Sequence, residues 1–211
     1  MREITLPTIK PNRVSLVDDQ GTTVLKMDSA QSGSTVALPF NFDPALTPQL
    51  SWRWKVSRVI DKANMETKSG DDFAARVYVF FDLPLASLSF MERIKLRLAR
   101  ALSNVDVPTA ALVYVWDNIH PIGTVQPSPY TRLVKVVVLQ SGAEGVGKWL
   151  GEKRDVAADF RLAFGREAPR VTGIAVGNDT DQTGDAVSAW FGDFRFEANT
   201  AANIAPSIAP K

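Results

Sequence analysis

The sequence predicts an all-β fold, an antiparallel β-sandwich of jelly-roll type. Short segments rich in Val, Phe, Tyr and Trp recur between clusters of Gly, Pro, Asn and Asp, which is typical of such sandwiches. The crossover helices that a parallel sheet requires are missing between them. A chain of 211 residues with 45% hydrophobic residues can form one large β domain. We therefore expect a single domain over residues 1–198.

Two of the expected strands carry the clearest patterns. Leu50, Trp52, Trp54 and Val56 alternate with polar residues, so this strand is expected to bury one face. The segment 75–81 has bulky side chains on both faces and is expected to be a central strand. The ten expected strands are 14–17, 23–27, 34–38, 50–56, 75–81, 111–116, 132–139, 148–156, 170–176 and 189–197.

Two segments have helical rather than strand periodicity. In residues 89–104 apolar residues fall on one arc and Arg93, Arg97 and Arg100 on the other, which predicts an amphipathic helix inserted between strands. This helix either packs on the sandwich or meets a membrane surface or a protein partner. A shorter helical turn is expected at 157–164. The tail 199–211 has no aromatic residue and is expected to be disordered.

The composition excludes several functional classes. Lys and Arg number 24 against 23 Asp and Glu, a net charge of +1 that gives no overall attraction for nucleic acid. There is no cysteine and a single histidine, His120, so cysteine-based zinc sites and multi-histidine metal sites are excluded. No apolar run has the length of a membrane span, and no organic cofactor is expected.

The loop 177–185 is the most specific local feature. It concentrates oxygen ligands at Asn178, Asp179, Asp181 and Asp185, and hard cations such as calcium bind carboxylate, amide and carbonyl oxygens. The sequence therefore predicts a structural calcium site. The alternative is a tight turn in which the same residue types cap backbone amides.

Other polar and aromatic residues are candidate ligand contacts. Asp71 and Asp72 precede Arg76 at the start of a strand, a group that can clasp a polyol or form an internal ion pair. Asp193 lies within an aromatic run, where it requires either a basic partner or a polar cleft.

Among the five tryptophans, Trp116 and Trp149 lie beside polar strand ends and are the expected platforms for sugar rings. Tyr130 can supply a hydroxyl group to a ligand-binding cleft. Glu152 and Arg154 are expected on one strand face beside Trp149, as ligand contacts or as an internal salt-bridge ladder.

Six segments, taken in order, resemble the bacterial family called domain of unknown function 3047. They are 52–56, 70–78, 112–116, 128–130, 149–156 and 178–193. The resemblance covers residues 35–197 and implies an exported protein whose mature form lacks its signal peptide, hence a periplasmic location. The strand pattern is also similar at fold level to the galactose-binding-like jelly rolls of carbohydrate-binding modules.

These observations favour a non-catalytic binding module of the periplasm or cell envelope for a glycan or another polyol-rich ligand. One alternative is an enzyme acting on glycans with Asp71, Asp72, Glu152 or Asp193 as acid and base, which would require a raised carboxyl pKa in a cleft. A second alternative is an envelope scaffold or lipid-associated protein that uses the helix 89–104.

Overall fold

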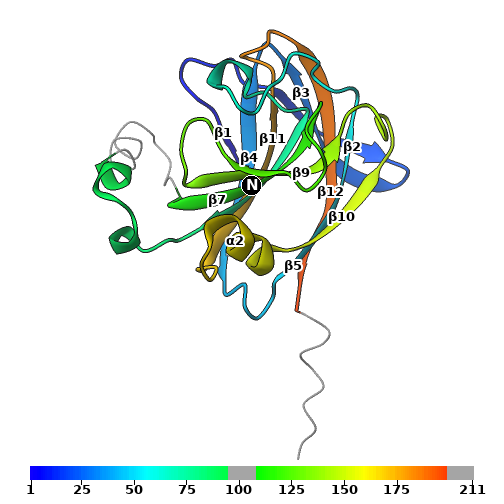
Figure 1. Cartoon of the computed structure of the whole chain (residues 1–211). Helices are drawn as coiled ribbons and strands as arrows, with labels where there is room; N and C mark the ends of the chain where they lie inside the picture. The colour runs from blue at the N-terminus through cyan, green and yellow to red at the C-terminus, as the bar shows by residue number, and fades with distance from the viewer. Residues whose placement is uncertain (95–107, 199–211) are drawn as a thin grey trace, which may run out of the picture.

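Two β-sheets face each other and enclose the main hydrophobic core (Figure 1). The computed structural model describes residues 1–94 and 108–198. The all-β sandwich prediction is confirmed. The larger sheet has the strand order β1 (Arg2–Ile4), β4 (Gly33–Phe42), β11 (Val171–Asp179), β6 (Ala75–Phe81), β7 (Ala110–Asp117), β9 (Val134–Ser141) and β8 (Val125–Pro127).

The smaller sheet has five strands. Their order is β10 (Leu150–Asp155), β5 (Gln49–Val56), β12 (Ala186–Glu197), β3 (Thr22–Ala30) and β2 (Arg13–Asp19). Among the described residues, the strand pairs of both sheets are antiparallel except β7 with β9, which is parallel. The expectation of a purely antiparallel sandwich is wrong at this pair. The strand β9 lies between β7 and β8 in the sheet and runs antiparallel to β8, so it runs parallel to β7.

Side chains that alternate between buried and exposed positions along the strands form the core. Trp52, Trp54 and Val56 of β5 are at most 2% exposed and face Val77 and Val79 of β6 in the space between the sheets. A second cluster covers the outer face of the larger sheet, where Met65 and Phe73 of the connection after β5 pack on β7 and β9. The central position expected for the strand 75–81 is therefore confirmed.

A short helix closes one end of the sandwich. The helix α2 (Val156–Phe164) follows β10 directly, and the side chain of Asp155 accepts a hydrogen bond from the amide of Ala158 at 2.8 Å. Gly165 ends the helix in the left-handed conformation. Phe160 of α2 is buried against Phe81, with ring centroids 4.5 Å apart. The helical turn expected at 157–164 is thus confirmed.

The inserted helix lies only partly within the described residues. Two 3-10 turns are present, Lys68–Gly70 and Leu85–Ser87, and residues 90–94 are helical, with Phe90 and Met91 exposed. The rest of the helix expected at 89–104 and the tail 199–211 lie outside the described residues. Within the described part of the chain, no helix has the length and hydropathy that a membrane span requires.

Two strand glycines provide a matched test of the packing between strands. A Cβ at Gly177 would lie 2.7 Å from Cγ2 of Thr35 and 2.8 Å from the carbonyl oxygen of Ser34, whereas a Cβ at Gly151 would meet no heavy atom within 4 Å. We expect Gly177→Ala to lower the free energy of unfolding by about 1–3 kcal/mol, the usual cost of overpacking. Gly151→Ala should change it by no more than about 0.5 kcal/mol. Urea denaturation measures both, and equal losses would contradict the close approach of β4 and β11.

Candidate functional site

Two half-buried tryptophans lie among cationic side chains on the outer face of the smaller sheet. Ser51, Arg53 and Lys55 point away from the core, opposite the buried residues of β5. The register of β5 with β12 pairs Lys55 with Trp190, and that of β12 with β3 pairs Trp190 with Lys26. We call Trp149, Trp190, Lys26, Arg53 and Lys55 the tryptophan face.

Cation–π contacts connect these side chains into a row. The guanidinium carbon of Arg53 lies 4.2 Å from the ring centroid of Trp149. The ammonium group of Lys55 lies 4.9 Å from the same ring and 4.7 Å from that of Trp190, and the ammonium group of Lys26 lies 5.4 Å from Trp190. Such contacts hold a cation over the negative face of an indole ring.

Carboxylates balance each cation of this face. Asp193 pairs with Nε of Arg53 at 2.6 Å, and Asp28 pairs with Lys26 at 2.9 Å. Asp19 lies 3.7 Å from both Arg53 and Lys55. Asp193 has a φ of +59° at an irregularity of β12, which directs its side chain toward Arg53. The basic partner expected for Asp193 is therefore present, although the sequence did not indicate Trp190, Lys26 or Arg53 as site residues.

Glycines leave room beside this row. Gly151 and Gly192 are the neighbours of Arg53 on the two adjacent strands, so neither places a side chain over it. A Cβ at Gly151 would meet no heavy atom within 4 Å, and the ring of Trp149, the residue before β10, contacts Arg53. The side chain of Lys55 is 19% exposed and that of Asp193 is 49% exposed. Part of this face is therefore in contact with solvent.

A second group of sequence candidates meets at one end of the larger sheet. Nε of Arg76 donates to Oδ1 of Asp179 at 3.0 Å, and the guanidinium also bonds the other oxygen of Asp179 and the backbone carbonyl of Asp71. Asp72 is fully buried and accepts hydrogen bonds from the amides of Gln182 and Thr183. The expectation that Asp71, Asp72 and Arg76 form one group is confirmed, with Asp179 as an additional member.

Burial sets the ionisation of this group. It raises the pKa of Asp179 from its ordinary 3.8 to about 7; Arg76 opposes this shift and the charge of Asp72 adds to it. Burial also raises the pKa of Asp71, against the effect of Arg76. Tyr130 lies at the rim, half exposed, and its hydroxyl donates to the carbonyl oxygen of Lys68 at 3.1 Å. The raised pKa of Asp179 and its ion pair with Arg76 therefore have opposite effects on the ionisation of this carboxyl group.

Two of the four metal ligands predicted for the loop 177–185 have structural partners instead. Asn178 is buried and bonds Asn12 and the carbonyl oxygens of Met27 and Val187, so it connects the two sheets. Asp185 forms an ion pair with Arg58 at 2.6 Å. Both side chains thus hold the strands around the loop together, and a metal-binding role for them stays a prediction.

Three carboxylates of the described residues remain close enough to share a cation. Asp72, Asp179 and Asp181 offer oxygen atoms that all lie within 4.8 Å of one another. Arg76 already neutralises part of this charge. Calcium at this cluster stays a prediction, with Asp179 and Asp181 as the ligands shared with the sequence analysis.

The candidate Trp116 lies inside the sandwich. Trp116 is 1% exposed, and its indole nitrogen donates to the carbonyl oxygen of Gly142, so the prediction that it is a ligand platform is wrong. It shares the inner face of β7 with Leu112 and Tyr114.

Glu152 and Arg154 do share a face of β10, as expected. Glu152 accepts hydrogen bonds from Trp54 and Gln140, and burial raises its pKa. Arg154 pairs with Asp159 of α2. The carboxylates considered for catalysis therefore occupy three separate networks.

Comparison with known proteins decides the family. The family model described as "Protein of unknown function (DUF3047)" matches residues 2–195. The chain belongs to the DUF3047 family. Among solved structures, this DUF3047 chain is similar to "Cellulose induced protein, Cip1", with 12% sequence identity over 93% of this chain and 90% of that one, at a TM-score of 0.34. The comparison with curated proteins finds no match.

The pKa of Asp179 predicts a pH dependence of stability. Because the folded state binds this proton more tightly than the unfolded chain, the contribution of Asp179 to stability falls as pH rises from about 4 to about 7. We expect the wild type to lose at least about 1 kcal/mol relative to Asp179→Asn over this range, since one unit of pKa shift corresponds to 1.36 kcal/mol. Urea denaturation in EDTA at several pH values measures the difference. If the free energies of unfolding of the two proteins changed with pH in parallel, Arg76 would keep Asp179 ionised over the whole range.

The calcium prediction is tested by thermal unfolding. A cation that binds only the folded state raises Tm with concentration. Calcium should then raise the Tm of the wild type, and Asp181→Asn should abolish the rise, whereas Asp185→Asn should retain it because Asp185 lies in the ion pair with Arg58. A Tm that does not respond to calcium, or an equal response in Asp181→Asn, would exclude a site at this cluster.

Proposed function

We propose that this DUF3047 chain is a non-catalytic binding module whose tryptophan face binds a neutral glycan. The observation that carries the proposal is the row formed by Trp149, which directly precedes β10, Lys55 of β5 and Trp190 of β12. Indole rings stack on the apolar C–H surfaces of sugar rings, and the side chains between them can bond hydroxyl groups. An extracytoplasmic location is part of the proposal, and cell fractionation tests it.

The charge balance of the face favours an uncharged ligand. Each cation has a carboxylate within 4.0 Å, so the face has no excess charge that would attract an acidic polysaccharide. Arg and Lys donate hydrogen bonds and Asp accepts them, and a sugar hydroxyl does both. A hydroxyl-rich neutral ligand therefore matches both the rings and the charges between them.

The fixed positions of the cationic side chains also support glycan binding at the tryptophan face. The ion pairs and ring contacts already hold the long side chains of Lys26, Arg53 and Lys55 in one arrangement. Binding then costs little further side-chain entropy, which otherwise amounts to about 0.5–1.5 kcal/mol for each flexible side chain that a ligand immobilises.

Affinity electrophoresis tests the proposed function directly. Gels containing hydroxyethyl cellulose, xylan or a mixed-linkage β-glucan should retard the wild type, and salt should not reverse the retardation. Trp149→Ala and Trp190→Ala should each weaken binding at least about tenfold, since buried aromatic contacts are frequent hot spots. Phe90→Ala, which removes an exposed ring from another part of the molecule, is the matched control.

Two results would contradict the proposal. The first is the absence of retardation by every neutral polysaccharide of a broad panel. The second is salt-sensitive binding of polygalacturonate with no binding of neutral polymers, because this would assign the ligand to charge attraction rather than to the rings.

A further inference from the structure

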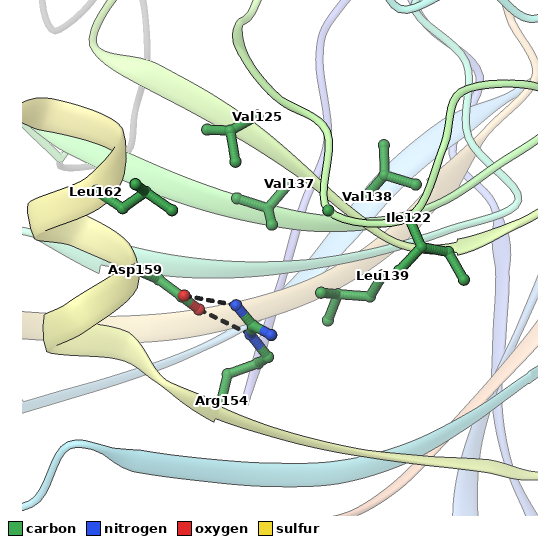
Figure 2. Close-up of a pocket in the computed structure, with 9 residues that line it drawn as sticks. Ile122, Val125, Val137, Val138, Leu139, Arg154, Asp159 and Leu162 are labelled. Carbon is green, nitrogen blue, oxygen red and sulfur yellow. Dashed lines mark hydrogen bonds and ion pairs between the residues drawn. The ribbon is translucent and has the colours of Figure 1, made fainter.

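A small pocket opens at one edge of the sandwich, between α2, β9 and the turn before β8 (Figure 2). Its volume is about 170 Å³. Val137, Val138 and Leu139 of β9 line it and are buried, so the wall belongs to the rigid core. The other lining residues are Ile122, Gly123, Val125, Arg154, Asp159 and Leu162.

One wall of the pocket is polar but carries no net charge. Nε and Nη2 of Arg154 donate to the two carboxylate oxygens of Asp159 at 2.8 and 2.5 Å. The buried hydroxyl of Tyr114 also donates to Asp159, at 2.8 Å, which fixes the carboxylate from the core side. The ion pair is therefore held in place on both sides.

The ion pair with Asp159 uses only one side of the guanidinium group. Nε and Nη2 of Arg154 bond Asp159, and Nη1 takes no part in this ion pair. Figure 2 shows the nitrogen that is not bonded to Asp159 on the side that faces Leu139. The side chain of Arg154 is 34% exposed, so the donor is neither sealed in the core nor fully in water. An acceptor placed in the pocket can reach it.

Apolar residues form the rim. Leu162 of α2 is 75% exposed and Ile122 is 64% exposed, although both line the pocket. A molecule in the pocket would remove part of these side chains from water, and burial of apolar surface is the main driving force of such binding.

We propose that this pocket binds a small aliphatic molecule that carries one neutral hydrogen-bond acceptor, such as a ketone or an ester carbonyl. An apolar cavity of about 150 Å³ holds benzene, so the size of this pocket corresponds to about six to eight carbon atoms. The lining residues are aliphatic and include no ring, which favours an aliphatic body over an aromatic one.

The ion pair selects against a charged ligand. A carboxylate at Nη1 of Arg154 would share its cation with Asp159 and would be repelled by that carboxylate. A carbonyl oxygen gains the hydrogen bond without this repulsion. The pocket shares no residue with the tryptophan face, so the proposal does not depend on glycan binding.

Methyl-labelled NMR titration tests the proposal, with 2-heptanone as the neutral probe and hexanoate as the charged one. We expect 2-heptanone to shift the methyl signals of Val125, Val137 and Leu139 in a saturable manner and to bind at least tenfold more tightly than hexanoate. Arg154→Lys keeps a cation beside Asp159 but removes Nη1, and it should weaken 2-heptanone binding several-fold.

A pair of exposed-site variants controls for folding. Leu162→Asp places a charge at the rim and should abolish the shifts, whereas Leu16→Asp changes another exposed leucine, on β2, and should leave them unchanged. Saturable shifts that persist in Leu162→Asp, or no saturable shift in the wild type, would overturn the site. Tighter binding of hexanoate than of 2-heptanone would overturn the assigned ligand class.

Discussion

The register of β5 between β10 and β12 is the constraint on which the core and the tryptophan face both depend. It directs Trp52 and Trp54 between the sheets and Arg53 and Lys55 to the outer face. A shift of one residue would exchange the two faces of the strand. Two indoles would then enter water and two cations would enter the core. The residues that specify folding therefore also determine which side chains a ligand can meet on this sheet.

Local patterns account for the parts of the fold that the sequence could predict. The alternation in residues 50–56 and the bulky residues of 75–81 depend only on neighbours in the chain, and both strands lie where expected. β1 and β8 have three residues each, which is too short for an alternating pattern. The parallel pairing of β7 with β9 involves strands far apart in sequence, so composition could not indicate it.

The site was less predictable than the fold because the type of a residue does not determine which neighbours its side chain faces. Asn178 and Asp185 have the oxygen atoms that a cation site requires, but Asn178 connects the sheets and Asp185 bonds Arg58. Trp116 follows Leu112 and Tyr114 at every second position, which indicates that it shares their inner face. Its position beside a polar strand end suggested exposure instead. For Trp190, only the register of β12 with β5 and β3 shows that it adjoins Lys55 and Lys26.

Stability alone does not explain the tryptophan face. Solvent-exposed ion pairs typically contribute no more than about 1 kcal/mol each, and small aliphatic or Thr side chains would fit the outer face of a sheet equally well. Here two large indoles remain partly in water, while Arg53, Lys55 and their carboxylates are held around them. This arrangement leaves apolar rings partly accessible and surrounds them with fixed hydrogen-bond donors and acceptors. A ligand with both apolar and hydroxyl surfaces would match it better than water does. This mismatch with water is the physical reason to test this face for ligand binding.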